Sequence, residues 1–290
     1  MTASGALDPN AAQDSGQQQG DRRGASDDAP APRLRAARPS LGQLRDLVVH
    51  LARREVSSTH RDTLLGWAWP LTRQLVQLAV LVFVFSKVLD LGIPDYPVFV
   101  FSGLIAWNWF TTGLSGGTRS LLSNRHLVFQ PRLPAVVVPI VAVAVPLIDV
   151  AIALPVLVVM LVVNDDLHAT ILLLPALLTV QFVLLAGLAW MTGAVSVYLR
   201  DVPNVVGVVL LLLFYVTPVY FALGKVPPEY ASILQLNPLA TLIEGYRSIL
   251  LDEPFPGTVR FAATVAASIA VAVAGLLVFR RLEPGFVDEL

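Results

Sequence analysis

The sequence predicts an all-α integral membrane protein with six transmembrane helices. Of its 290 residues, 55% are hydrophobic and 14% are charged, and the mean hydropathy is +0.68. Apolar runs recur along the chain, and each is close to the roughly 20 residues that a helix needs to cross a hydrocarbon core. Lys and Arg gather in alternate connections between these runs, as expected of loops that stay on the cytoplasmic side.

The first 60 residues differ from the rest of the chain. Residues 1–38 have almost no large apolar side chain, and such a segment cannot bury enough surface to offset its ordering entropy. We therefore expect a disordered cytoplasmic tail. Between residues 39 and 60, Leu and Val recur at helical spacing beside Arg45, Arg53 and Arg54. This pattern predicts an amphipathic interface helix with its basic side toward anionic headgroups or a partner protein.

Residues 61–290 form the predicted six-span transmembrane domain. The first span runs from Pro70, which a first helical turn tolerates, to Leu89. Trp67 and Trp69 lie where amphipathic rings are expected to meet the headgroups. The later spans are expected at about 97–115, 135–163, 170–197, 204–223 and 259–279.

Loop charges predict the orientation of these spans. The loops 116–134 and 198–204 carry Arg, whereas 90–96 and 164–168 are acidic. The positive-inside rule then places both basic loops and both termini in the cytoplasm. The acidic loops and the segment 224–258 come out on the far side.

The segment 226–256 predicts two short helices that enter the membrane and return on the far side. Asn237 is expected to cap the second helix and Pro238 to occupy its first turn. Glu244 and Arg247 are neighbours at i,i+3 on this helix. Such a re-entrant backbone is tolerated at membrane depth only where it packs on protein or lines a cavity.

Polar residues also occur inside the spans. Arg73 and Gln77 share one face of the first span because they are four residues apart, and such a face must meet protein or water. The simpler alternative is that Arg73 extends to the interface. Asp149 in the third span is expected to be packed against a partner, although an ionisable group there is also a functional hypothesis.

No motif for catalysis is present. The chain lacks G-x-x-x-x-G-K-[ST], so we expect it to bind no ATP through a P-loop of its own. Its four His residues have no metal-ligand spacing, and Asp165 and Asp166 are better explained as solvated charges of an exposed turn. His50 with Glu55 is the best pair for a membrane-embedded glycan- or acyl-transferring enzyme, but both lie among arginines on the predicted surface helix. We expect neither enzyme activity nor a cofactor or metal in this chain.

Four segments together are typical of one transporter family: RDTLLGWAWPL (61–71), YLRDVPNVVGVVLLLLFYVTPVYF (198–221), NPLATLIEGYRSILL (237–251) and FRRLEPGFVDEL (279–290). They resemble the membrane subunits of type-2 ATP-binding-cassette exporters for O-antigen, teichoic acid and related cell-envelope polysaccharides. The resemblance covers about residues 40–290 and leaves the tail 1–38 out.

The resemblance implies a homodimeric permease in the cytoplasmic membrane, energised by two copies of a separate P-loop ATPase that holds ATP and Mg. Its cargo is expected to be a lipid-linked polysaccharide of O-antigen, teichoic acid or galactan type, and no nucleic acid is involved. A drug or lipid exporter is the alternative within transport.

The resemblance also assigns expected roles to residues. The loop 116–134 becomes the coupling element toward the ATPase, through Arg119, Asn124, Arg125 and His126. Simple determination of topology explains its arginines equally well. The re-entrant helices become an outer gate, which contains Asn237, Pro238, Glu244 and Arg247.

The channel is expected between protomers and lined by the first and fifth spans. Its expected lining residues are Arg73, Gln77, Phe214, Tyr215, Tyr220 and Phe221. The four aromatic rings can stack on sugar rings without strict hydrogen-bond recognition, although packing within the span is the alternative.

Overall fold

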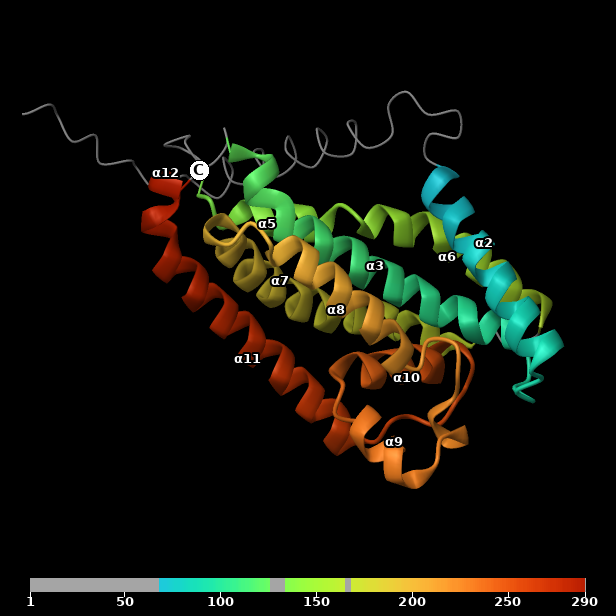
Figure 1. Cartoon of the computed structure of the whole chain (residues 1–290). Coiled ribbons are helices and arrows are strands. Elements are labelled where there is room, and N and C mark those ends of the chain that lie inside the picture. The colour runs from blue at the N-terminus through green and yellow to red at the C-terminus, as the bar shows by residue number, and fades with distance from the viewer. Residues whose placement is uncertain (1–67, 126–133, 165–167, 290) are drawn as a thin grey trace, which may run out of the picture. The chain divides into compact units, whose positions relative to one another are not determined.

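A computed structural model describes residues 68–125, 134–164 and 168–289, all of which belong to one unit, Pro39–Leu290. The expected tail 1–38 and interface helix 39–60 lie outside the described residues. Every regular element in the described ranges is helical (Figure 1). The elements are α2 (Trp69–Val82), the π-helix η2 (Phe83–Val88), α3 (Tyr96–Ser123), α5 (Val137–Ala144), α6 (Leu147–Val163), η3 (Ala169–Leu173), α7 (Leu174–Tyr198), α8 (Val202–Val216), η4 (Leu223–Lys225), α9 (Pro228–Leu234), α10 (Pro238–Leu250), α11 (Thr258–Leu282), η5 (Glu283–Gly285) and α12 (Phe286–Glu289).

The predicted class, an all-helical membrane protein, is confirmed. Five helical segments of the described chain are long and apolar enough to cross a membrane. They are Trp69–Val88, Tyr96–Ser123, Val137–Val163, Ala169–Tyr198 and Thr258–Glu289.

Helix α3 is the core of the bundle. Its apolar stretch is 78% buried, against 11% for the first span and 17% for the last. Helices α2, α5, α6, α7, α8 and α10 all contact it, and Figure 1 shows it running through the middle of the bundle. Because α3 is surrounded by protein, apolar side chains follow one another around its whole circumference.

Helix α3 also extends eight residues beyond its expected end at 115, so that 116–123 of the predicted basic loop is helical. Gly116 and Gly117 do not end the helix, because they are packing positions rather than turns. A Cβ atom at Gly117 would collide with Ala189 of α7. Tertiary packing therefore outweighs the low helix propensity of the two glycines.

The fifth span is shorter than expected. Helix α8 ends at Val216, and with 15 residues it spans roughly 22 Å. The chain leaves helical geometry at Thr217 because the residue before a proline, here Pro218, is pushed toward extended backbone. The count of six complete spans therefore stays a prediction, with five long segments and this shorter apolar helix observed.

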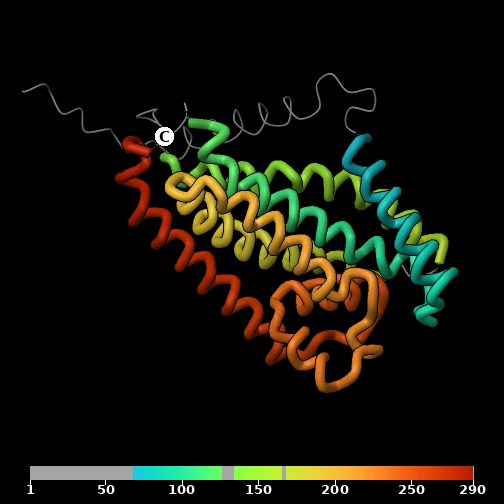
Figure 2. The backbone as a smooth tube through the Cα atoms, viewed as in Figure 1, coloured from blue at the N-terminus to red at the C-terminus, as the bar shows by residue number. Residues whose placement is uncertain are grey.

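The predicted pair of short helices before the last span is present as α9 and α10, separated at Asn237. Figure 2 shows the chain passing from the end of α8 through both helices and then into α11. One apolar stripe of α10 is buried, and the helix packs against α3, α7 and α11. This stripe comprises Leu239, Leu242, Ile243, Tyr246 and Leu250.

Helices α7 and α11 pack at backbone distance. Gly187 and Gly275 face each other at the crossing, and a Cβ atom on Gly275 would collide with the carbonyl oxygen of Gly187. Small residues at a crossing allow two membrane helices to approach closely, which strengthens dispersion contacts where lipid removes the hydrophobic driving force.

We expect Gly275→Ala to lower the unfolding temperature, because the added methyl group forces α11 away from α7. Overpacking of this kind costs about 1–3 kcal/mol. Gly207→Ala on α8 is the matched control, since a Cβ atom there meets nothing within 4 Å. Thermal unfolding in detergent, followed by tryptophan fluorescence, compares the variants. Equal midpoints would contradict the close crossing.

Candidate functional site

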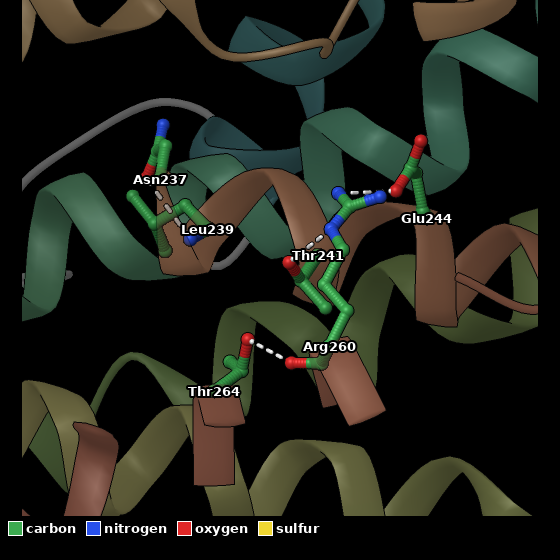
Figure 3. A network of polar contacts seen from close by, with 6 residues as sticks. All are labelled: Asn237, Leu239, Thr241, Glu244, Arg260 and Thr264. Carbon is green, nitrogen blue, oxygen red and sulfur yellow. Dashed lines mark hydrogen bonds and ion pairs between the residues drawn. The ribbon is translucent and has the colours of Figure 1, made fainter. Parts of the chain in front are cut away.

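Hydrogen bonds of the Asn237 side chain connect the end of α8 to the start of α10. Its side-chain Oδ1 accepts a hydrogen bond from the backbone N–H of Leu239 at 3.0 Å, which confirms the predicted helix cap (Figure 3). Its Nδ2 donates to the Thr217 hydroxyl at 2.9 Å. One amide thus fixes both the break in α8 and the first turn of α10.

The irregular segment 217–222 is held by a buried arginine. Arg247 on α10 is 1% exposed, and its Nη2 donates to the carbonyl oxygen of Val219 at 2.7 Å. The guanidinium carbon lies 3.4 Å from the ring centroid of Phe99 on α3, a close cation–π contact. Gly103 leaves room for this arrangement, because a Cβ atom there would lie 3.2 Å from Nη2. Arg247 therefore bonds α10, α3 and the segment 217–222 together.

Glu244 forms its ion pair with Arg260 of α11 and not with Arg247, its neighbour in sequence. The Nε atom of Arg260 also donates to the Thr241 hydroxyl at 3.0 Å, so that two α10 side chains bind one arginine (Figure 3). Arg260 was not among the predicted site residues. A signal was available, since Arg260 is a basic residue at the predicted outer end of a span, where the positive-inside rule disfavours one.

The four aromatic residues expected to line the channel do come together. Together with two further aromatic residues, Phe85 and Trp107, they form the ring cluster, defined here as Phe85, Trp107, Phe214, Tyr215, Tyr220 and Phe221. Tyr220 is its centre, with ring centroids 4.9 Å from Phe85, 5.5 Å from Phe214 and 5.2 Å from Phe221. Phe214 also contacts Trp107 and Tyr215, at 5.5 and 5.7 Å.

The ring cluster is open on one side. Trp107 is buried, three of the rings from α8 and the segment after it are half-buried, and Tyr215 is 61% exposed. Phe85 and Trp107 were not among the predicted lining residues, because an aromatic residue in an apolar run has no pattern that distinguishes it from its neighbours.

Arg73, the first of the two polar residues expected in the channel lining, lies apart from the ring cluster. Arg73 is exposed and lines a separate polar cavity between α2, α3 and α6, together with Gln74. Gln77 is half-buried on α2. The expected channel lining is therefore divided between two places in the structure.

The opposite end of α3 presents the residues expected to couple to an ATPase. Arg119 and Arg125 are exposed. Asn124 ends the helix, with Nδ2 donating to the carbonyl oxygen of Ser120 at 3.0 Å. His126 lies outside the described residues.

This end of the bundle is well packed. Leu121, Val197, Phe279 and Phe286 belong to one buried cluster, which unites the ends of α3, α7 and α11 with α12. The Tyr198 hydroxyl donates to the carbonyl oxygen of Leu282 at 2.8 Å. The exposed arginines thus project from a rigid base. Within the described ranges, no group of three His, Asp or Glu side chains is arranged to hold a metal ion.

We expect Arg247→Leu to destabilise the protein, since the carbonyl oxygen of Val219 loses a charged donor in a buried position. A hydrogen bond to a charged group contributes about 1.5–3 kcal/mol. Arg200→Leu, at an exposed position of the α7–α8 turn, serves as the control, with an expected change within about 0.5 kcal/mol. Thermal unfolding and limited proteolysis at 217–227 measure both. A midpoint of Arg247→Leu equal to that of Arg200→Leu would show that Arg247 is not the anchor.

Comparison with known proteins relates this architecture to transport. A family model described as ABC-2 type transporter matches residues 46–251. The chain is 28% identical to the O-antigen export system permease protein RfbA of Myxococcus xanthus over 253 residues, which are 86% of this chain and 97% of that protein. It is 25% identical to an RfbA of Klebsiella pneumoniae, with 87% and 97% covered. Identity to the polysialic acid transport protein KpsM of Escherichia coli is 22%, with 81% and 93% covered. Since the family model spans most of the chain, this protein belongs to the ABC-2 type transporter family.

Proposed function

We propose that this chain is the membrane subunit of an exporter that moves a lipid-linked cell-envelope polysaccharide across the cytoplasmic membrane. The observation that carries the proposal is similarity along almost the whole length of relatives named as O-antigen export permeases. The polymer is of the O-antigen, teichoic acid or galactan class, and ATP hydrolysis takes place on a separate ATPase subunit.

The ring cluster supports a sugar as the cargo. Aromatic faces pack against the C–H faces of sugar rings, and they tolerate variation in the sugar because they impose no strict hydrogen-bond pattern. Tyr215 offers an exposed ring at the edge of this cluster. A long polymer that moves stepwise requires contacts of this weak and repeated kind.

Two copies of the chain would enclose the path. Helix α8 buries only Val206 and Leu210 of its 15 residues, and α2 buries only Gln74 and Leu78. Both helices therefore present most of their surface to lipid or to a second copy. We assign the path to the space between α2 and α8 of two protomers, with α9 and α10 at its outer end.

The ATPase is proposed to dock at the cytoplasmic end of α3, where Arg119 and Arg125 project, with Asn124 and His126 beside them in sequence. Both termini are placed on this side of the membrane. Two ATPase copies would then serve the two protomers.

We expect Arg119→Glu with Arg125→Glu to abolish co-purification of a P-loop ATPase from mild-detergent membranes, because two cations that would attract acidic side chains of the ATPase become anions that repel them. Lys225→Glu, exposed on the far-side segment, is the control and should leave the complex intact. Mass spectrometry and ATPase activity of the eluate provide the measurement. Cells that carry the double variant should accumulate lipid-linked glycan inside. A chain that purifies without any P-loop protein would contradict the proposal.

We expect Tyr215→Ala to slow export severalfold while the ATPase still binds, because an exposed stacking face is lost. Stacking on one aromatic ring contributes about 1 kcal/mol to binding. A loss of this size from the rate-limiting step slows export roughly fivefold. Leu277→Ala on α11, which is equally exposed at 63% but lies outside the proposed path, is the control. Surface glycan measured after induction distinguishes them. Equal rates for both variants would remove the ring cluster from the path.

A further inference from the structure

A polar cavity of about 150 Å³ lies between α2, α3 and α6, apart from the ring cluster. Its polar lining includes Arg73, Gln74, Asn108, Thr112 and Asp149. All five come from helical segments that are long and apolar enough to cross a membrane.

Two amide groups in this lining have atoms that need a partner. Gln74 is 5% exposed, and its Oε1 accepts no hydrogen bond from any described residue. The buried Nδ2 of Asn108 likewise donates to no described residue. Hydrocarbon cannot satisfy such groups, so they are retained where water or a polar ligand reaches them.

The chemistry of the two amides defines what can bind. Gln74 offers a carbonyl acceptor and Asn108 an N–H donor, so one occupant that serves both must donate and accept. A hydroxyl group does both. Arg73 and Asp149 contribute opposite formal charges to the same lining, so the cavity has no net formal charge and favours a neutral ligand over an ion.

The size of the cavity agrees with this chemistry. One water molecule needs a cavity volume of about 10–15 Å³. This cavity therefore has room for a group of waters or for the hydroxyl-bearing edge of a sugar. Trp109 and Val150 provide an apolar wall beside the polar groups, which is the usual composition of a site for a small neutral ligand.

We propose that this cavity is a binding site for neutral hydroxyl groups, supplied by water or by a sugar. The hydroxyl groups in this cavity then hydrate the side of α2 that faces α3, within the membrane-spanning part of the helix. Water as the source does not depend on the proposed function, whereas a sugar as the source rests on it.

Cysteine labelling tests the site directly, because the chain contains no cysteine of its own. Thr112→Cys places a thiol on the lining, and Val273→Cys places one on an exposed apolar position of α11. The probe is 2-aminoethyl methanethiosulfonate applied to everted membrane vesicles that contain the full chain. It reacts with the thiolate, which forms only where water has access. We expect Thr112→Cys to react at least tenfold faster than Val273→Cys. Arg200→Cys is the fully hydrated reference, because it lies at an exposed position of the α7–α8 turn, which is expected on the cytoplasmic face that everted vesicles present.

A second measurement uses the unsubstituted protein, in case Thr112→Cys fails to fold. Radiolytic hydroxyl radicals modify side chains that lie beside water, so Trp109, which is 2% exposed but lines the cavity, should be modified more than the buried Phe101. Labelling of Thr112→Cys as slow as that of Val273→Cys, or Trp109 as protected as Phe101, would overturn the proposal.

Removing the cargo separates the two sources. Labelling is repeated in vesicles from cells treated with tunicamycin, which blocks the first sugar transfer to the lipid carrier. An unchanged fast rate for Thr112→Cys identifies water as the ligand, and a rate that rises at least threefold identifies a sugar that had shielded the thiol. A failed ATPase co-purification with fast labelling would remove the exporter proposal and leave the hydroxyl site in place.

Discussion

Hydrocarbon offers no hydrogen bonds, and this constraint decides how the end of the bundle that contains α10 is built. Where α8 stops at Thr217, the backbone leaves helical geometry and its carbonyl groups must be satisfied by protein. Arg247 does this for Val219 while its guanidinium lies on the ring of Phe99. Asn237 donates to the Thr217 hydroxyl, and the Tyr96 hydroxyl donates to the carbonyl oxygen of Tyr220 at 2.7 Å. The position of Tyr220, and hence of the ring cluster, depends on these contacts together with the buried cation.

The sequence predicted the features that depend on local chemistry. Asn237 followed by Pro238 identifies a helix start from two residues alone, and the structure has the side-chain cap at that place. The helical class and the long spans followed in the same way from apolar runs of sufficient length. The extended geometry at Thr217 was also locally encoded by Pro218, but the apolar residues beyond it extended the predicted span to 223.

Contacts between distant residues could not be predicted in this way. Arg247 bonds to residues 28 and 148 positions away, and no spacing rule links them. Glu244 had a cation within reach on its own helix but pairs with Arg260, because packing of α10 on α11 brings that side chain closer. The first span shows the same limit on a smaller scale. Periodicity identified a polar face at Arg73 and Gln77, whereas the buried amide is Gln74, since only the neighbouring helices determine which flank of α2 is covered.

The glycine crossing between α7 and α11 has a mechanical consequence. Two backbones in direct contact cannot slide past each other without separating first. Helices α7 and α11 and the core helix α3 therefore form one rigid unit. Helices α2 and α8 each bury two side chains only, so they have less packing to lose than α7 or α11 when the bundle changes shape. A displacement of α3 together with α7 and α11 would therefore change the contacts of α2 and α8 before it changed the glycine crossing.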